Sequence, residues 1–272
     1  MRRSRTVNVV GAGPGGLASA MLLAAEGFDV EVFEKRGHVG GRTSVMDLDG
    51  YRFDRGPTFF LYPQILEQVF ARCGRSLHDE IELIRLDPNY RLVFEEGGVI
   101  DATSDVERMR AQLAEINPAD AAALDGYLRA NRDKLEAFRP ILERPFLSHL
   151  DLLSLPLDQV LPLRRSVDDD LKRHFSDQRV RLGFSFQSKY LGMSPFRCPS
   201  LFTILAFLEY EHGVFHPAGG CGAVTEAMAR VAREMGVRIH LNRPIRQVEL
   251  EGRRAVGVWT DEGLHRADAH VI

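Results

Sequence analysis

A glycine-rich loop between two predicted strands constrains the fold of this chain more than any other feature. Residues 6–10 form a short β-branched run, which predicts a buried parallel strand. Gly11, Gly13 and Gly16 follow in the spacing GxGxxG, and an apolar helical segment comes next. Residues 29–34 alternate in polarity and predict the second strand. This strand–loop–helix–strand order predicts an α/β fold with a Rossmann-like domain that binds a dinucleotide.

Each glycine of the loop has its own predicted task. Gly11 permits a tight turn, Gly13 leaves room for a pyrophosphate, and Gly16 lets the helix lie close to the strand. Gly15 stands in the same loop, where the N–H groups at the start of the helix attract phosphate. Glu34 ends the second strand, and its carboxylate would accept hydrogen bonds from ribose hydroxyls. The alternative is a glycine-rich turn that merely begins a helix, and the complete β-α-β context favours the dinucleotide.

A second glycine loop indicates which dinucleotide to expect. Gly40 and Gly41 follow the second strand, and consecutive glycines let the backbone pass close to a bulky ligand. Arg42 adds a planar donor that suits phosphate oxygens, and Lys35 and Arg36 come shortly before it. Both arginines could instead be ordinary surface residues, and this alternative is stronger for Arg36 than for Arg42. An enzyme that holds extended FAD needs this second loop and a nicotinamide dehydrogenase does not, so FAD is the predicted cofactor.

The next segment begins at Gly50 and ends in the turn Gly56-Pro57-Thr58. With these motifs the sequence resembles the flavin family that includes amine oxidases, protoporphyrinogen oxidase and the carotenoid desaturases. The resemblance implies that the first loop binds the ADP half of FAD and that the second loop runs beside the pyrophosphate. It also implies that the Gly56-Pro57-Thr58 turn lies near the flavin ring, and that the backbone of Ile245 lies against the adenine.

Three later segments, residues 186–195, 199–203 and 208–220, resemble the bacterial phytoene-desaturase type of carotenoid desaturases. The resemblance implies desaturation of a long acyclic isoprenoid by hydride transfer to the flavin, with oxygen or a quinone as the final electron acceptor. A polyene offers no charge, so a protein must hold it by apolar burial, at about 25 cal/mol per Å². Residues 184–208 are rich in aromatic and aliphatic side chains that suit such a wall, although plain core packing predicts the same composition.

The resemblance also predicts how the chain is divided. Residues 1–104 would form the first segment of an FAD-binding domain, and residues 105–212 an inserted, mainly helical substrate segment. Residues 213–272 would return into the FAD-binding domain. The resemblance covers only the N-terminal half or so of the desaturases, so the C-terminal part of the family fold is expected to be missing. The chain would then be a fragment or a truncated gene product, and a less favoured alternative is that a partner chain supplies the rest.

Local signals refine this picture within the predicted insertion. Asn117-Pro118 predicts the start of a helix that runs to about Phe138 and ends before Pro140. Residues 140–163 carry many leucines and predict two short amphipathic helices. Residues 166–169 predict a capping box for the next helix.

No convincing catalytic base is apparent, and the catalytic residues are unknown at this point. Glu209 and Glu211 are weak candidates, with surface exposure expected for both. His212 and His216 stand four residues apart, but the intervening sequence reads as a strand rather than a metal-binding helix. The three cysteines are far apart and show no metal-ligand spacing, so no metal site is expected.

Composition excludes several other classes. The chain has 272 residues and a net charge of −3, which gives no reason to expect a nucleic-acid partner. Few cysteines and the absence of a secretory leader predict a cytoplasmic protein. No apolar run is long enough to span a bilayer, so any membrane contact would be peripheral, on the inner face of the membrane. The remaining alternatives are an amine oxidase or protoporphyrinogen oxidase, an inactive flavin-binding fragment and, less well supported, a nicotinamide dehydrogenase.

Overall fold

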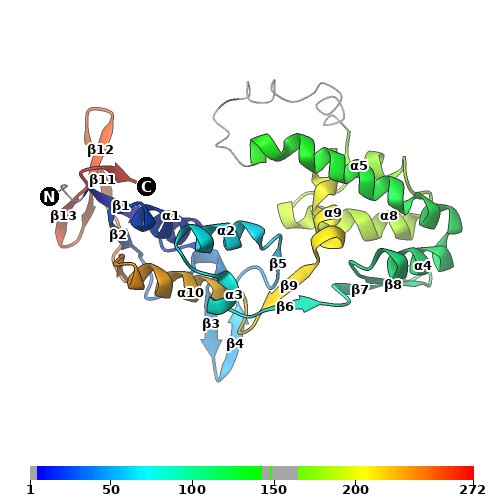
Figure 1. Ribbon diagram of the computed structural model, residues 1–272, viewed down its shortest axis with the longest axis horizontal. Helices are drawn as coiled ribbons and strands as arrows, with labels where there is room; N and C mark the ends of the chain where they lie inside the picture. The colour runs from blue at the N-terminus through cyan, green and yellow to red at the C-terminus, as the bar shows by residue number, and fades with distance from the viewer. Residues whose placement is uncertain (1–4, 143–147, 149–164) are drawn as a thin grey trace. The chain divides into compact units, whose positions relative to one another are not determined.

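Residues 5–142, 148 and 165–272 are described by a computed structural model, shown in Figure 1 with colour running from the N-terminus to the C-terminus. The chain forms two compact units. Unit 1 consists of Met1–Arg85 and Phe215–Ile272, and unit 2 is Leu86–Val214. Unit 2 is thus an insertion in the sequence of unit 1. The predicted substrate segment, residues 105–212, lies within unit 2. The roles predicted for the two units, FAD binding and substrate binding, stay predictions.

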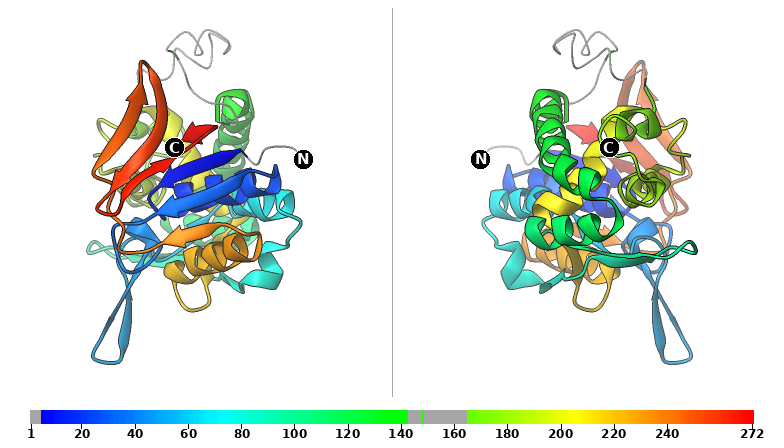
Figure 2. Two further views of the ribbon diagram at one scale, coloured as in Figure 1. Left: turned by 90° about the vertical axis from the view of Figure 1, so that its left-hand side faces the viewer. Right: turned by 90° about the vertical axis from the view of Figure 1, so that its right-hand side faces the viewer.

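A four-stranded parallel sheet in the order β10-β2-β1-β14 forms the centre of unit 1, and Figure 2 shows its strands side by side. Its strands are β1 (Thr6–Val10), β2 (Asp29–Phe33), β10 (Arg238–His240) and β14 (His270–Val271). The β-branched residues Val7, Val9 and Val32 are buried against the helices α1 (Pro14–Ala25) and α10 (Cys221–Glu234). The α/β fold and the two strands predicted around the glycine loop are confirmed.

A three-stranded antiparallel sheet follows β10. Its strands, in the order β11-β12-β13, are β11 (Gln247–Glu251), β12 (Arg254–Thr260) and β13 (Gly263–Arg266). β12 contains Trp259, the one tryptophan of the sequence.

A separate two-stranded hairpin, which the sequence analysis missed although Asp49-Gly50 is a typical hairpin turn, extends away from the rest of unit 1 in Figure 2. It consists of β3 (Val45–Leu48) and β4 (Tyr51–Asp54). The turn residues Asp49 and Gly50 both have positive φ, at 50° and 82°, the conformation that a tight two-residue hairpin turn requires.

Short elements complete unit 1 and lead to unit 2. The helices are α2 (Gln64–Arg72) and α3 (Leu77–Glu80), and the short sheet β5-β9-β6 comprises β5 (Phe60–Leu61), β9 (Val214–Pro217) and β6 (Leu83–Leu86). The chain leaves unit 1 along β6 and returns to it along β9.

Unit 2 is mainly helical. It contains α4 (Val106–Ile116), α5 (Pro118–Leu142), α7 (Val167–Leu171), α8 (Gln178–Ser185), α9 (Thr203–His212), the 3₁₀ turns η4 (Phe186–Leu191) and η5 (Ser200–Phe202), and the hairpin β7 (Tyr90–Val93) with β8 (Val99–Ala102). Its core is aromatic: the ring centroids of Phe175 and Phe184 lie 4.9 Å apart, and those of Tyr127 and Phe184 lie 5.0 Å apart. Phe184 and Phe207, both counted in the predicted apolar wall, are therefore ordinary core residues.

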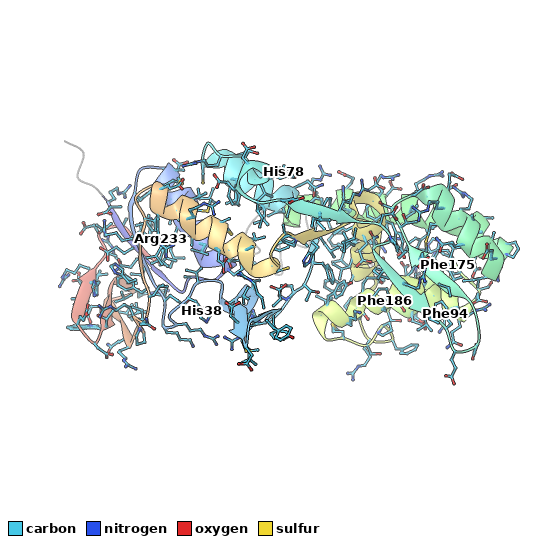
Figure 3. The ribbon with its side chains drawn as sticks, turned by 90° about the horizontal axis from the view of Figure 1, so that it is seen from below. His38, His78, Phe94, Phe175, Phe186 and Arg233 are labelled. Carbon is cyan, nitrogen blue, oxygen red and sulfur yellow. The ribbon has the colours of Figure 1, made fainter. Side chains whose placement is uncertain are left out.

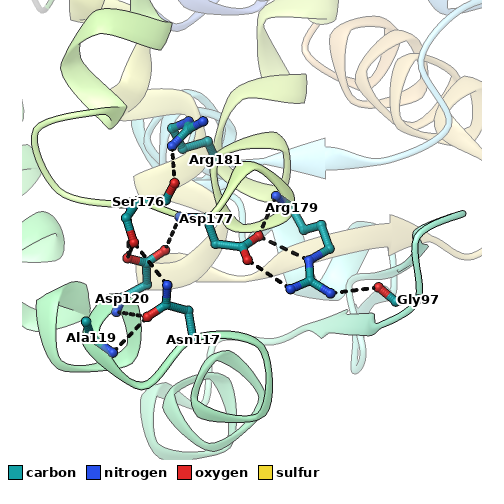
Figure 4. Close-up of polar contacts among 8 residues, drawn as sticks. All are labelled: Gly97, Asn117, Ala119, Asp120, Ser176, Asp177, Arg179 and Arg181. Carbon is teal, nitrogen blue, oxygen red and sulfur yellow. Dashed lines mark hydrogen bonds and ion pairs between the residues drawn. The ribbon is translucent and has the colours of Figure 1, made fainter.

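Capping explains where several of these helices begin. The predicted capping box is confirmed, with the Ser166 hydroxyl accepting from the Asp169 N–H and the Asp169 carboxylate accepting from the Ser166 N–H. The Asn117 side chain accepts hydrogen bonds from Ala119 N and Asp120 N, which confirms the predicted start of α5 (Figure 4). Asp120 in turn accepts from Ser176 N at 2.8 Å and from Asp177 N, so it ties α5 to the segment before α8.

The predicted end of α5 was wrong, since the helix continues past Pro140 to Leu142. A proline in the last turn removes one intrahelical hydrogen bond and does not prevent its own φ from being helical. The amphipathic helices predicted within residues 140–163 lie almost wholly outside the described residues.

Candidate functional site

The first glycine loop leaves β1 and enters α1 without any side-chain cap on the helix. Gly11 has a φ of +100°, and its N–H donates to Phe33 O at 2.8 Å. A Cβ on Gly16 would lie 2.0 Å from Gly11 O, so only glycine allows the helix to pack here. A Cβ on Gly13 would meet nothing within 4 Å, so the space before the start of α1 is open. Gly16 thus serves packing, as the motif predicts, and the pyrophosphate position expected at Gly13 stays a prediction beside an open space.

Glu34 braces this loop from the end of β2. Its side chain is 5% exposed, and its two carboxylate oxygens accept from Ala12 N at 2.8 Å and from Arg36 N at 2.9 Å. A carboxylate has about four acceptor positions, so Glu34 can still accept hydrogen bonds from hydroxyl groups of a ligand. The acid predicted to meet a ribose is therefore also a structural clamp, which the sequence pattern does not reveal.

The second glycine loop lies directly on the first. Gly40 N donates to Ala12 O at 2.8 Å, and a Cβ on Gly41 would approach Gly13 Cα to 3.2 Å. Gly40 has a φ of +103°, which favours glycine at this turn. Arg42 follows in η1 (Gly41–Thr43) and is exposed.

The Gly56-Pro57-Thr58 turn lies beside this pair of loops. A Cβ on Gly56 would come within 2.2 Å of Arg42 O, so the two backbones are in close contact. His216 of β9 hydrogen-bonds Thr58 O through Nδ1 at 2.7 Å. The turn is thus held on two sides, and His216 has a hydrogen-bonding role there.

Asp54 holds the strand that leads into this turn. Its carboxylate accepts from Cys221 N at 3.1 Å and from Gly222 N at 3.2 Å, which caps the N-terminus of α10. Sequence analysis missed this residue. A signal was present, because Gly219 and Gly220 open α10 and have no side chain that could cap it.

Ile245 follows a segment that runs beside the end of β2. Arg243 N donates to Glu34 O at 2.8 Å, and Asn242 N donates to Arg36 O at 2.9 Å. Ile245 is half-buried, whereas Lys35 and Arg36 are exposed. The structure therefore brings the predicted cofactor residues of both glycine loops, the turn at Gly56 and this segment together within unit 1.

This set of residues fits a dinucleotide on structural grounds. The helix N-terminus has free N–H groups and the positive end of a helix dipole, both of which favour phosphate. The open space at Gly13 would be filled by a side chain in any other residue, and Glu34 and Arg42 supply an acceptor and a donor nearby.

The predicted exposure of Glu209 was wrong. Glu209 lies on α9 in unit 2 and is 0% exposed. Its carboxylate accepts hydrogen bonds from Tyr90 Oη at 2.7 Å, Tyr190 Oη at 2.8 Å and Gln187 Nε2 at 2.9 Å. Burial raises the pKa of Glu209, and the hydrogen bonds from Gln187, Tyr90 and Tyr190 oppose that rise. Because its oxygens are enclosed and bonded, Glu209 orders its neighbours and does not present a base to a ligand.

Glu211, two residues later, is exposed as expected and pairs with Arg132 at 2.7 Å. Within the described residues, no group of three or more His, Cys, Asp or Glu side chains could hold a metal ion. Nor does any helix in the described part of the chain have the length and apolarity needed to cross a bilayer.

Comparison with known proteins identifies the class. The family of flavin-containing amine oxidoreductases matches residues 14–272, so the chain belongs to that family. Within it, the chain is 38% identical over its whole length to a 4,4'-diapophytoene desaturase (4,4'-diapolycopene-forming) of Methylomonas sp, and 37% identical over 98% of its length to a zeta-carotene-forming phytoene desaturase of Myxococcus xanthus. These alignments cover 54% and 53% of the two relatives, so the chain spans about half the length of the curated relatives it matches.

Solved structures agree on the fold. An oxidoreductase from Methanosarcina mazei matches with a TM-score of 0.68 at 20% identity, over 97% of this chain and 58% of that one. Putrescine oxidase matches with a TM-score of 0.64 at 21% identity, over 99% of this chain and 57% of the oxidase. The predicted resemblance to carotenoid desaturases within a flavin family is therefore confirmed, while at these identities the structures speak for the fold alone.

Proposed function

We propose that this chain binds FAD and contributes to the desaturation of a long acyclic isoprenoid. The observation that carries the cofactor assignment is the stacking of the second glycine loop on the first, through Gly40 N and Ala12 O, beside an uncapped helix start. Membership of a flavin-containing family supports the flavin rather than a nicotinamide. The similarity to desaturases that act on phytoene-like compounds supports the substrate class.

The roles of the residues follow from their positions. Main-chain N–H groups at the start of α1, including those of Gly15 and Gly16, would bind the pyrophosphate, with Arg42 as a side-chain donor. Glu34 would accept from the ribose hydroxyls, with Lys35 and Arg36 flanking it. When bound, FAD supplies the two-electron acceptor for removal of hydrogen from a C–C bond.

The remaining predicted contacts concern the two ends of the cofactor. The Gly56-Pro57-Thr58 turn would lie against the flavin end, where its backbone is fixed by Arg42 O and His216. The half-buried segment at Ile245 would lie against the adenine. For the substrate, unit 2 would supply apolar surface, and the exposed side chains after α8 rather than its buried aromatic core are the candidates: Tyr190, Leu191, Met193 and Phe196.

Flavin binding is tested with a substitution that the fold tolerates. Gly13→Val adds a side chain where the structure has nothing within 4 Å, so the protein should fold while the phosphate position is blocked. Gly126→Val in unit 2 is the matched control, since a Cβ there also meets nothing within 4 Å. We expect FAD, titrated by quenching of its fluorescence, to bind the unaltered chain and Gly126→Val, and to bind Gly13→Val at least about tenfold more weakly. Equal FAD affinity of all three proteins would show that the loop is not the phosphate site.

The substrate class is tested separately, because the chain spans about half of its relatives. The purified chain with FAD is incubated with phytoene or diapophytoene in vesicles, and with amines as competitors. New conjugated double bonds in the absorption spectrum support the proposal. Release of hydrogen peroxide from an amine with no change in the polyene would assign an amine oxidase, and flavin binding without any turnover would leave the chain as a flavin-binding unit only.

A further inference from the structure

A cavity of about 550 Å³ lies in unit 1 between α10, β3 and the two ends of the second glycine loop. Small-molecule sites in proteins have volumes of about 300–1,000 Å³, so this cavity has room for an organic molecule and not only for an ion. None of the residues assigned above to FAD is among those that line it. The cavity is therefore distinct from the predicted cofactor site.

The second glycine loop lies between this cavity and the first glycine loop. Gly41 faces the first loop, since a Cβ there would lie 3.2 Å from Gly13 Cα. Gly40 faces α10, since a Cβ there would lie 2.8 Å from Oγ1 of Thr225, which lines the cavity. A ligand in the cavity would thus leave the phosphate position expected at Gly13 unoccupied.

Ser44 gives the cavity wall a hydrogen-bonding group that the protein itself leaves unused. The residue is 2% exposed, and its hydroxyl has no hydrogen-bond partner among the described residues. Its main chain is held in place, because Ser44 O accepts from Arg55 N at 3.0 Å. A buried polar group without a partner destabilises a fold, so such groups are uncommon, and an oxygen of a bound ligand would supply the missing partner.

Two arginines on the cavity wall carry unpaired charges. Arg55 follows β4 and Arg233 lies in the last turn of α10, and neither has an ion-pair partner within the ranges that the structure describes. Two acids also line the cavity, but Glu226 is already paired with Arg52 at 3.0 Å. Asp47 is then the unpaired acid of the described wall, opposed by two guanidinium groups. The excess of positive charge favours an anion.

The rest of the wall is largely apolar. Val39, Val45 and Leu241 line the cavity beside the polar groups. His38 adds an aromatic ring, whose Nδ1 hydrogen-bonds Val39 O at 3.0 Å, and Figure 3 shows His38 and Arg233 in unit 1, with Arg233 on α10. An occupant with an anionic end and an apolar body matches this lining better than an inorganic ion does.

We propose that this cavity binds a small organic molecule that carries a phosphate group. Arg55 and Arg233 pair with the phosphate oxygens, which guanidinium groups match in geometry and charge, and the Ser44 hydroxyl donates to the same group. The apolar side chains and the His38 ring cover the organic part. The site uses none of the residues proposed for FAD, so its test does not depend on the proposed function.

The probe is phenyl phosphate, titrated into the purified chain by calorimetry. Inorganic phosphate, benzoate and benzyl alcohol are the comparison ligands, because each lacks one part of the probe: the ring, the phosphate or the charge. We expect phenyl phosphate to bind at least about tenfold more tightly than any of the three. Its binding should weaken with added salt, and this dependence needs no variant.

The charge variant is Arg55→Gln with Arg233→Gln. Its control is Arg129→Gln with Arg173→Gln, which removes the same charge from exposed positions of unit 2. We expect the charge variant to bind phenyl phosphate at least about tenfold more weakly than the unaltered chain, because two charge-assisted hydrogen bonds are lost. The control should bind as the unaltered chain does.

Ser44→Ala separates binding from folding. The change removes a buried hydroxyl that has no partner, so the free protein should unfold at the same urea concentration or a higher one. Phenyl phosphate should nevertheless bind at least about threefold more weakly. A merely structural hydroxyl would give the reverse pattern, with a lower unfolding midpoint and unchanged affinity.

Histidine ring resonances in NMR spectra locate the probe. The signals of His38 should move on addition of phenyl phosphate, whereas those of His78 on α3, which does not line the cavity, should stay (Figure 3). His38→Gln and His78→Gln assign the two sets of signals. The titration is repeated with FAD at saturation, and unchanged affinity for phenyl phosphate is expected. If FAD does not bind, the His38 signals locate the probe without it.

Four results would overturn the proposal. The first is the absence of phenyl phosphate binding to the unaltered chain. The second is equal affinity of the charge variant and its control. The third is loss of phenyl phosphate binding in the presence of FAD with the His38 signals unmoved, which would place the probe at the glycine loops. The fourth is equal affinity for inorganic phosphate or for benzoate, which would make the cavity a site for a simple ion or for a carboxylate.

Discussion

Two glutamates on the same helix should differ sharply in what they contribute to stability. Removing the Glu209 carboxylate by Glu209→Ala leaves Tyr90 Oη with the distant Tyr210 Oη, at 3.5 Å, in place of its acceptor at 2.7 Å. Gln187 Nε2 also loses its bond to Glu209, but it keeps Tyr90 Oη at 3.0 Å and Gly183 O at 3.4 Å. A buried donor left without a good partner costs about 1–3 kcal/mol, whereas the hydroxyl of Tyr190, a residue that is 36% exposed, can turn to water. Removing the carboxylate also removes the cost of burying it, which offsets part of this loss. We expect a net loss of about 1–3 kcal/mol in the free energy of unfolding of unit 2.

The matched control is Glu211→Ala. Glu211 is exposed and pairs with Arg132, and exposed pairs contribute about 0–1 kcal/mol. Glu209→Gln provides an intermediate case, because it keeps the volume and one carbonyl oxygen.

The assay is unfolding in urea, monitored by hydrogen exchange in peptides from α9 and η4. Trp259 belongs to unit 1, so its fluorescence reports separately on that unit. Equal losses for Glu209→Ala and Glu211→Ala would refute the reasoning, since they would mean that the hydrogen bonds at Glu209 do not contribute to folding.

Two further predictions concern a cap and pH. Asp54→Ala should destabilise the start of α10 by about 0.5–2 kcal/mol, measured as faster hydrogen exchange in its first turn. Asp133→Ala, at an exposed position within α5, is the near-neutral control. Burial raises the pKa of Glu209, so its contribution to the stability of unit 2 is fully present below the ordinary glutamate pKa of 4.5 and is lost as pH rises through the raised pKa. Glu31 in unit 1 should behave oppositely: burial raises its pKa, but Arg238 and His240 outweigh that effect and lower it. The contribution of Glu31 is then present above 4.5 and lost as pH falls through the lowered pKa. The difference in stability between the unaltered chain and Glu209→Gln, and between the unaltered chain and Glu31→Gln, measured against pH, checks both signs.

The conformation of the first glycine loop could be predicted because each of its requirements is local in the sequence. Gly11, Gly13 and Gly16 lie in one short segment between β1 and the first turn of α1. What each glycine permits follows from the backbone geometry of a strand–turn–helix unit with this spacing. The caps at Asn117 and Ser166 are local in the same way. Asp54 is different, because the helix that it caps begins more than 160 residues later, as the separation of 167 residues between Asp54 and Cys221 shows.

The burial of Glu209 could not be predicted for the same reason, because its partners are distant in the sequence. In a helix that is apolar on most sides, a glutamate followed by Tyr210 and Glu211 predicts an exposed position, because an unpaired buried carboxylate is costly. The cost is met by donors 119 and 19 residues away, Tyr90 and Tyr190, which no periodicity in the sequence connects to Glu209. Burial raises the pKa of both tyrosines, so each keeps the proton that it donates. A buried acid with three hydrogen-bond donors is a positioning group: it holds η4, and with it the exposed side chains that we propose as substrate contacts.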